Sequence, residues 1–379
     1  MMSNAEGTGD DDLGAEFEKE FANETKKLGR FNLAIFGKTG VGKSTLINTV
    51  FREQVATTGN TRNVTRDTTY YEKEGVPLGI YDTEGWTMGE TGKRALKGFH
   101  SLCEGLKDKP TSEHVHVIWY CVRAGDRRFE DAQAEFVQEL CSVGIPVLLV
   151  LTQVAMNNQG EHHPDALVLA EDIESRGLPT HPSGRVHLTM AMEDTFKGEP
   201  AHGLEALVED TLQAAPEGVR RAFINAQQID MKSKIREARL VTTRAAAAAA
   251  VAGATPIPFS TAALLVPIQV TMMAAIAAVF GLSTSARQLA ALVGELFCAT
   301  AVTQAGKYLV TNLLKFVPGA NIAAATVEAG VAAALTKGVG EAWIVVCRQI
   351  HQQEAALEDL PLDELKKLFI DAFKRSNED

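Results

Sequence analysis

The segment Gly37–Ser44 has the residue types and spacing most clearly suited to chemistry in this chain. It reads GKTGVGKS and directly follows the apolar run Phe31–Phe36. This spacing matches the phosphate-binding pattern G-x-x-x-x-G-K-[ST]. Glycines let backbone N–H groups face a β-phosphate, Lys43 can reach the β- and γ-oxygens, and the Ser44 hydroxyl can bind Mg²⁺. The expected nucleotide-binding residues of this loop are Gly37, Lys38, Thr39, Gly40, Val41, Gly42, Lys43, Ser44 and Thr45.

Two later segments carry residues that would complete such a site. The tetrapeptide Asp82–Gly85 ends the second apolar strand after the loop and has the form D-x-x-G. Its aspartate would hold Mg²⁺ through water, and its glycine N–H would face the γ-phosphate. Between the two lies Asn63–Asp67, where Thr65 could be a further Mg²⁺ ligand, although other threonines compete for that role: Thr61, Thr68 and Thr69. The predicted metal ligands are Ser44, Thr65 and Asp82, and the predicted catalytic residues are Lys43, Thr65 and Gly85.

Strands and helices alternate around these motifs. Apolar runs predict strands at Phe31–Phe36, Asp67–Glu72, Leu78–Asp82, Val115–Val122, Val147–Leu151 and Val186–Met190. Helical spacing predicts helices at Lys43–Phe51, Phe129–Cys141, Asp165–Ser175 and Leu204–Ala214. Such alternation is typical of a mostly parallel sheet covered by helices, and the hairpin over 67–82 adds one antiparallel strand. The predicted fold class is an α/β domain of this kind followed by an all-α domain.

The second half has a different composition. No charged residue occurs from Ala245 to Ala286, and alanine dominates. Three prolines interrupt this run and would each end or kink a helix: Pro256, Pro258 and Pro267. Further helices are expected at Arg287–Lys315, Ile322–Lys337, Ala342–Leu360 and Leu362–Phe373. With Pro216 and Gly218 as an edge, the expected domains are an acidic tail at 1–14, a short amphipathic helix at 15–28, the α/β domain at 29–215 and the helical domain at 216–379.

Composition bears on partners and location. The net charge of −11 over 379 residues argues against a general nucleic-acid binder, so no nucleic-acid partner is expected. The five cysteines are scattered and odd in number, which is typical of free thiols in a reducing, cytoplasmic compartment. The charge-free run at 245–286 is long enough to enter a bilayer, with Pro258–Gly281 as the best window. It could equally supply the central helix of a bundle, and the sequence leaves both readings open.

Residues 31–86 resemble a G domain of the translation-factor-related class, close to the Era, Der and MnmE type. The resemblance lies in the phosphate loop, the D-x-x-G element and the V-T-R-D stretch at Val64–Asp67. It implies GTP and Mg²⁺ as cofactors and slow hydrolysis by in-line attack of water. The alanine-rich half resembles the uncharacterised helical domain that follows many Era-type G domains. It is also similar to the helical part of immunity-related GTPases, most clearly at Ala254–Pro258.

Two positions depart from the family pattern. Guanine specificity normally comes from N/T-K-x-D, which corresponds here to Thr152–Ala155. Thr152 fits and Gln153 could lie over the base, but Ala155 lacks the carboxylate, which should cost roughly 2–4 kcal/mol of base discrimination. Asn157 or Asn158 could compensate in part. Trp86 occupies the place where many relatives carry a water-orienting glutamine, which predicts slow intrinsic hydrolysis.

Two functions fit these residues. The first is a Mg²⁺-dependent GTP-binding and slowly GTP-hydrolysing protein whose nucleotide state controls the helical domain. The alternative is a nucleotide-binding scaffold or membrane-remodelling protein with negligible turnover. The expected partner is a guanine nucleotide. A homodimer through the G domain and membrane contact through residues 245–286 stay open.

Overall fold

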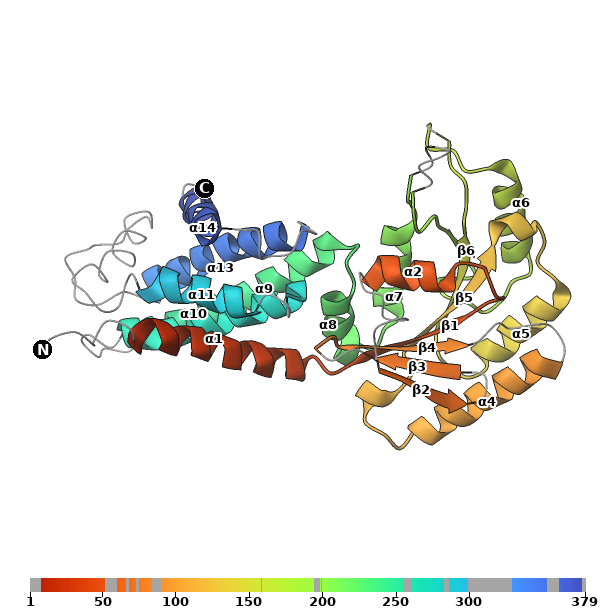
Figure 1. The fold of residues 1–379 in the computed structure, drawn as a ribbon, viewed down its shortest axis with the longest axis horizontal. Coiled ribbons are helices and arrows are strands. Elements are labelled where there is room, and N and C mark those ends of the chain that lie inside the picture. The colour runs from red at the N-terminus through yellow and green to blue at the C-terminus, as the bar shows by residue number, and fades with distance from the viewer. Residues whose placement is uncertain are drawn as a thin grey trace, which may run out of the picture. The chain divides into compact units, whose positions relative to one another are not determined.

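The computed structural model describes residues 8–51, 60–65, 68–72, 75–83, 90–157, 159–193, 198, 200–254, 261–282, 286–298, 329–352 and 361–376. It divides the chain into two compact units. One is Leu28–Met231 and contains the sheet; the other combines Met1–Lys27 with Lys232–Asp379 and is helical where described (Figure 1). The helical unit is therefore assembled from both sides of the α/β unit in the sequence.

The α/β unit is built on a seven-stranded sheet with the order β2-β3-β4-β1-β5-β6-β7. Strand β3 pairs antiparallel with both of its neighbours, whereas β4, β1, β5, β6 and β7 pair in parallel. This confirms the predicted fold class. The strands are β1 (Phe31–Phe36), β2 (Asn60–Thr65), β3 (Thr68–Glu72), β4 (Leu78–Thr83), β5 (Val117–Arg123), β6 (Val147–Thr152) and β7 (Val186–Leu188).

Strand β2 was not expected, because its sequence NTRNVT lacks the apolar alternation of a half-buried strand. Its partner accounts for it. It pairs with β3 from Asn60↔Glu72 to Thr65↔Thr68, with a register irregularity between Asn63 and Thr65. An edge strand gains its ladder from one neighbour and can remain polar. The segment that was expected to offer Thr65 to Mg²⁺ is therefore, up to Thr65, a strand.

Helices cover both faces of the sheet. Because successive strand residues point to opposite faces, β1 sends Phe36 to one core and Phe31 to the other. The first core also contains side chains of α4 (Glu90–Leu106), α5 (Asp131–Cys141) and α6 (Pro164–Ser175). The second contains side chains of α2 (Lys43–Phe51), α7 (Leu204–Ala214) and α8 (Glu217–Ala226). Helices α4 and α8 were not predicted. Two short turns, η1 (Thr111–Glu113) and η2 (Ala124–Asp126), flank β5.

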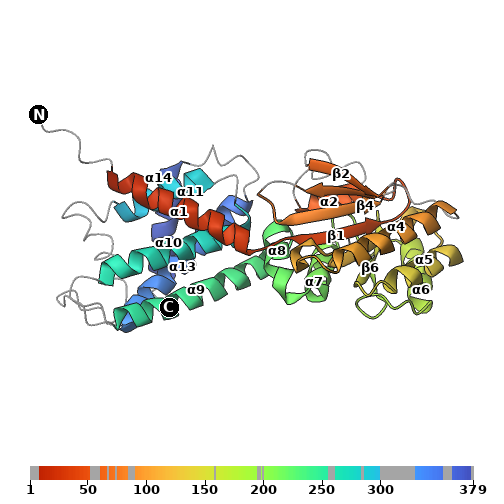
Figure 2. The same ribbon diagram turned by 90° about the horizontal axis from the view of Figure 1, so that it is seen from below.

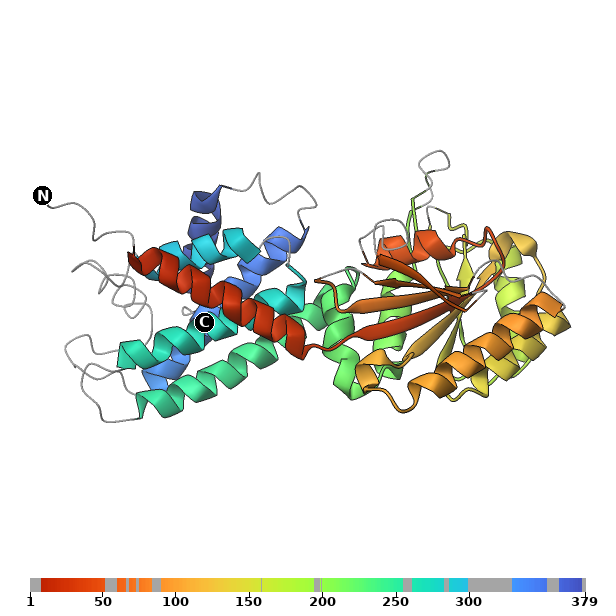
Figure 3. The same ribbon diagram turned by 60° about the horizontal axis from the view of Figure 1, so that its bottom comes forward.

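Helices of the helical unit pack around α10 (Thr261–Phe280), which is apolar. Its residues Met272–Phe280 are all buried. Helix α1 packs against α10 and α11, and α13 packs against α10 and α14. The ring of Phe17 on α1 lies between Phe21 and Trp343. The helices are α1 (Thr8–Lys27), α9 (Met231–Gly253), α10 (Thr261–Phe280), α11 (Ala286–Cys298), α13 (Ala329–Gln352) and α14 (Leu362–Ser376). Figures 2 and 3 show these helices from two further directions.

Several helix boundaries differ from the expectation. Helix α1 already begins at Thr8, within the segment assigned to an acidic tail. Helix α10 continues through Pro267 rather than ending there; Pro256 and Pro258 lie outside the described residues. Helix α13 is continuous where the sequence predicted a break between Lys337 and Ala342.

Packing explains the unbroken α13. Its Gly338 and Gly340 are buried, and a Cβ on Gly340 would lie 2.6 Å from the Oγ1 of Thr242 on α9. These glycines therefore allow close helix contact instead of ending the helix. Among the described helices, α13 is long and apolar enough to cross a membrane, although 61% of its most apolar window is buried within the protein.

Candidate functional site

The phosphate-binding loop occupies the turn between β1 and α2. Three of its glycines have positive φ angles: 144° at Gly37, 80° at Gly40 and 96° at Gly42. A Cβ on Gly37 would lie 2.5 Å from the carbonyl oxygen of Cys121 in β5. Glycine is needed at Gly37 because both the backbone conformation and the neighbouring strand exclude a side chain.

Lys43 begins α2 and folds back across the loop. Its side chain is nearly buried, and Nζ donates to the carbonyl oxygen of Gly37 at 2.9 Å and approaches that of Lys38 at 3.4 Å. The next residue, Ser44, is exposed at the same helix start. An ammonium group and a helix N-terminus thus meet at one point, which is the arrangement that binds phosphate.

Asp82 reaches the same edge of the sheet from β4. The parallel register places it beside Ile35, two residues before Gly37. The neighbouring Thr83 donates from Oγ1 to the carbonyl oxygen of Ile35 at 3.0 Å, which fixes the end of β4 against β1. The Ser44 hydroxyl and the Asp82 carboxylate are oxygen donors of the kind Mg²⁺ prefers. Thr65 ends β2, but its side chain, like the whole of Gly85 and Trp86, lies outside the described residues.

Cys121, in β5, lies directly beside Gly37 of the phosphate loop. Burial raises the pKa of its thiol to about 12, and the charges of Lys43 and Asp82 act on it in opposite directions. The thiol therefore stays protonated at neutral pH and serves as packing against Gly37. The described cysteine side chains are free thiols, as predicted: Cys103, Cys121, Cys141 and Cys347.

Thr152 and Gln153 connect the end of β6 to the loop. The buried Thr152 hydroxyl lies 2.5 Å from the carbonyl oxygen of Val41 and 3.1 Å from that of Val122. Gln153 has a positive φ of 56° and an exposed side chain, whose Nε2 is 3.5 Å from the carbonyl oxygen of Gly40. The structure thus brings both predicted residues to the loop. Thr152 holds the loop by its contact with the Val41 carbonyl oxygen, and the Gln153 side chain lies next to Gly40.

The loop after Ala155 uses its own polar groups to hold its shape. Asn157 accepts at Oδ1 from the backbone N–H groups of Gln159 and Glu161, at 3.0 and 2.9 Å. Its Nδ2 donates to the Glu161 carboxylate at 2.9 Å. An amide oxygen has two acceptor positions, so the side chain of Asn157 is committed to this turn. It is a poor substitute for the missing carboxylate at Ala155, and Asn158 lies outside the described residues.

The histidines near this loop have a structural role. His163 precedes α6 and accepts at Nδ1 from the backbone N–H of Asp165 at 3.2 Å, which caps the helix. Asp165 in turn pairs with Arg127 at 3.0 Å. Within the described residues no group of three or more His, Cys, Asp or Glu side chains could hold a metal ion.

Glu130 is a neighbour of the phosphate loop that the sequence alone did not identify. The Oε1 atom of Glu130 lies 3.8 Å from Lys38 Nζ and 3.2 Å from Arg128 Nη2. Glu130 is also the N-cap of α5 and forms a reciprocal capping box with Gln133. The usual capping-box signature begins with Ser, Thr, Asp or Asn, so a glutamate followed three residues later by glutamine gave only a partial signal for the cap. Its contact with Lys38 depends on the sheet, which sets β1 beside β5.

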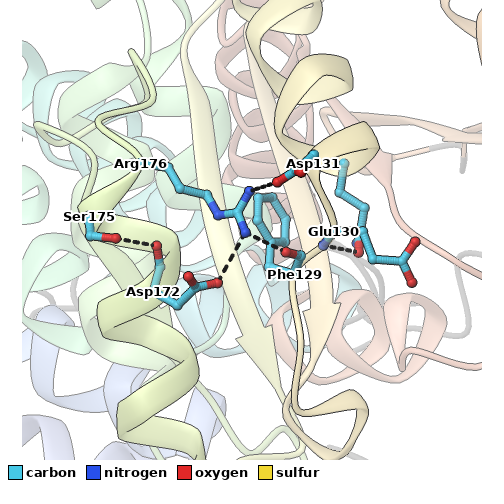
Figure 4. Close-up of polar contacts among 7 residues, drawn as sticks. Phe129, Glu130, Asp131, Asp172, Ser175 and Arg176 are labelled. Carbon is cyan, nitrogen blue, oxygen red and sulfur yellow. Dashed lines mark hydrogen bonds and ion pairs between the residues drawn. The ribbon is translucent and has the colours of Figure 1, made fainter.

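Arg176, at the C-cap of α6, holds the start of α5 in place. Its guanidinium donates to the Asp131 carboxylate at 2.8 Å and to the Phe129 carbonyl oxygen at 2.7 Å, and approaches Asp172 at 3.4 Å (Figure 4). The same group lies 5.3 Å from the centre of the Phe129 ring. The hydrogen bond to Asp131 is the main cause of a raised pKa for Arg176. The segment bearing Glu130 is thereby fixed beside the loop.

Comparisons with known proteins agree with this geometry. Residues 32–153 match the family model described as 50S ribosome-binding GTPase, and residues 220–373 match a domain of unknown function, DUF697. A probable GTP-binding protein EngB from Metamycoplasma arthritidis (strain 158L3-1) is 24% identical over 145 residues, which are 37% of this chain and 76% of the relative.

Two solved structures are also similar to part of the chain. A crystal structure of a probable GTP-binding protein engB is 18% identical, with a TM-score of 0.33, over 48% of this chain and 97% of that one. A structure of Era in complex with MgGDPNP and nucleotides 1506–1542 of 16S ribosomal RNA is 20% identical, with a TM-score of 0.33, over 50% of this chain and 58% of that one. The two family models show that the chain contains a GTP-binding P-loop GTPase domain, of the family described as 50S ribosome-binding GTPase, over residues 32–153 and a DUF697 domain over residues 220–373.

Proposed function

We propose that this protein is a Mg²⁺-dependent GTPase whose nucleotide state controls its helical unit. The observation that supports the control is the place of α1. This helix packs on α10 and α11 of the helical unit, yet it ends at Lys27, and β1 begins at Phe31. β1 leads directly into the phosphate loop. The helical unit is therefore joined covalently to both ends of the GTPase domain, through α1 at one end and α9 at the other.

The described residues fit a magnesium nucleotide. Ser44 and Asp82 would supply oxygen ligands, directly or through water, and bound Mg²⁺ would neutralise charge on the phosphoryl oxygens. Lys43 would bind the phosphate chain in place of its present contacts with the Gly37 and Lys38 carbonyl oxygens. Thr152 holds the phosphate loop in place through the contact of its hydroxyl with the Val41 carbonyl oxygen.

The control of the helical unit follows from its double attachment. A change in the phosphate loop or in the β2–β3 hairpin can act on α1 through the short link to β1, and on α9 through its covalent junction with the GTPase domain at Met231. A ligand shifts such an equilibrium only by its difference in affinity for the two states. The helical unit would therefore alter the ratio of GTP to GDP affinity in return.

Hydrogen exchange of the full chain with GDP and with a non-hydrolysable GTP analogue tests this proposal. We expect different protection in α1 and α9 between the two states, in addition to changes in the phosphate loop. Equal exchange throughout the helical unit, with both nucleotides bound, would contradict the control. A control variant, Thr152→Val, should weaken nucleotide binding without altering exchange in the helical unit of the nucleotide-free protein.

The rate of hydrolysis distinguishes the enzyme from a scaffold. We expect a slow turnover that requires Mg²⁺ and is lost in Lys43→Ala. Tight GTP binding with no measurable phosphate release, with or without lipid vesicles and at rising protein concentration, would instead identify a nucleotide-binding scaffold.

A further inference from the structure

The outward side of α9 changes from basic to apolar along its length. We define the α9 face by its exposed residues Lys232, Arg236, Arg239, Leu240, Thr243, Arg244, Ala247, Ala248 and Val251. Its four basic side chains lie between Lys232 and Arg244, whereas residues 245–253, its apolar half, hold no charge. Val251 in the apolar half is 74% exposed and Leu240 is 46% exposed. Singly exposed apolar side chains are common on protein surfaces, and what distinguishes this helix is that they share a face with its basic side chains.

The packing of α9 determines which side faces outward. Ala238, Val241, Thr242 and Ala249 are buried on the opposite side. Thr242 lies against Gly340 of α13 so closely that no Cβ would fit between them. In Figures 2 and 3, α9 runs along an outer side of the helical unit. The α9 face is thus fixed as an outer surface of this unit.

The charge on this face is largely uncompensated. Arg239 pairs with Glu341 at 3.2 Å. The side chains of Lys232, Arg236 and Arg244 form no ion pair within the part of the chain that the structure describes. Glu237 is the one acidic residue in the sequence of α9. A basic surface on a chain with a net charge of −11 selects a negatively charged partner locally.

We propose that the α9 face binds the surface of an anionic lipid bilayer. Each Lys or Arg near such a surface contributes about 1 kcal/mol, so the three basic side chains that form no ion pair among the described residues supply about 3 kcal/mol. Arg239, which is paired with Glu341, adds to them only in part. The charge-free part, residues 245–253, is about 13 Å long at 1.5 Å per residue, far short of a hydrocarbon core of about 30 Å. It would therefore enter the headgroup region without spanning the membrane.

This assignment moves the expected membrane contact along the chain. The most apolar segment, Met272–Phe280 of α10, packs inside the helical unit and presents no exposed residue. Alanine adds little to insertion, so binding by the α9 face depends mainly on its charges and falls with salt. The inference concerns lipid binding alone and is independent of nucleotide control.

Flotation of the full chain with phosphatidylcholine vesicles, with and without phosphatidylserine, tests the proposal. We expect binding only to the phosphatidylserine vesicles, weakened by added salt. The variant Arg236→Glu/Arg244→Glu should bind at least tenfold more weakly. The matched control, Lys367→Glu/Arg375→Glu on exposed positions of α14, should bind like the unchanged protein. Both variants should retain the urea unfolding profile of the unchanged protein and its GTP hydrolysis in the absence of lipid, which shows that both units fold.

The apolar half has its own variant, Val251→Ser, which should reduce binding to the same vesicles without changing the salt dependence. Equal binding to both kinds of vesicle, or unaltered binding by the double reversal, would overturn the proposal. Self-association that the double reversal abolishes, in a protein that binds neither vesicle, would also overturn it and would identify the α9 face as a contact between two copies.

Discussion

The GTPase unit and the helical unit use their buried polar groups differently. In the GTPase unit, Lys43, Thr83 and Thr152 bond to carbonyl oxygens at the ends of strands or in the phosphate loop, all at one edge of the sheet. In the helical unit, Trp343 donates to the Met273 carbonyl oxygen, and Lys234 donates to that of Val279. The first set shapes a binding site, whereas the second fixes the central helix α10.

This difference separates binding from stability. Substitutions at the edge of the sheet should alter nucleotide affinity and leave the fold intact, because the loop they position lies at the surface. Substitutions around α10 should destabilise the helical unit, and should change nucleotide affinity far less than substitutions in the phosphate loop do, because the two units are compact in themselves. The following predictions test that separation.

The largest effect is expected for Lys43→Ala. The loss of a nearly buried ammonium that would bond to phosphate oxygens should weaken GTP binding by about 100-fold or more. Titration calorimetry measures this, and the melting temperature should stay unchanged. Lys38→Ala is the matched control, since Lys38 is one-third exposed and pairs with Glu130 at 3.8 Å; it should change affinity by a few-fold. Equal effects of the two variants would contradict the site as described.

A smaller effect, confined to the helical unit, is expected for Gly340→Ala. The new Cβ would meet the buried Thr242, whose hydroxyl already donates to the Ala238 carbonyl oxygen at 3.0 Å. Such overpacking costs about 1–3 kcal/mol of unfolding free energy. Urea unfolding measures it, while GTP affinity should stay the same. Gly330→Ala, in the same helix with open space around it, should be neutral or slightly stabilising.

The pH dependence of stability should be stronger in the GTPase unit because of His187. The pKa of His187 is lowered from 6.5 to about 4, mainly because the side chain is buried. The charge of Asp210, 3.5 Å away, raises this pKa, but by less than burial lowers it. The unfolded chain takes up a proton near pH 6.5 but the native state does not, so stability present above pH 6.5 is lost as the pH falls toward 4. The loss is about 1.4 kcal/mol per pH unit.

Hydrogen exchange at pH 7 and pH 5.5 reports the two units separately and measures this loss. The variant His187→Gln removes the titrating group and should flatten the dependence in the GTPase unit. An identical pH dependence in the variant and the unchanged protein would show that His187 does not contribute.

The smallest effect concerns base recognition. Ala155→Asp restores the carboxylate that guanine recognition normally uses. It should recover part of the roughly 2–4 kcal/mol that the missing carboxylate costs, and so raise the preference for GTP over ATP by about tenfold. Competition binding with GTP, ATP and XTP measures it. Asn157→Ala is the control, because its amide is committed to the turn with Glu161, and it should leave the preference unchanged. If Asn157→Ala alone removed the preference, the base contact would come from Asn157.

The sequence by itself determined the phosphate loop and the elements on either side of it. The predicted bounds of β1, α2 and α7 agree with the structure. The reason is local: the spacing of glycines and lysine, the apolar strand and the helical periodicity all lie within one short segment. The mostly parallel sheet followed for the same reason, since every strand except β2 was visible in its own residues, as were the helices α2, α5, α6 and α7.

Contacts between distant residues could be decided only by the tertiary structure. Strand β2 exists because β3 supplies its ladder, and α13 continues through Gly340 because α9 packs there. Glu130 reaches Lys38 because β5 lies beside β1 in the sheet. In each case the stabilising partner is far away in the chain. At these positions, packing between distant residues outweighs the local helix or strand propensity of the sequence.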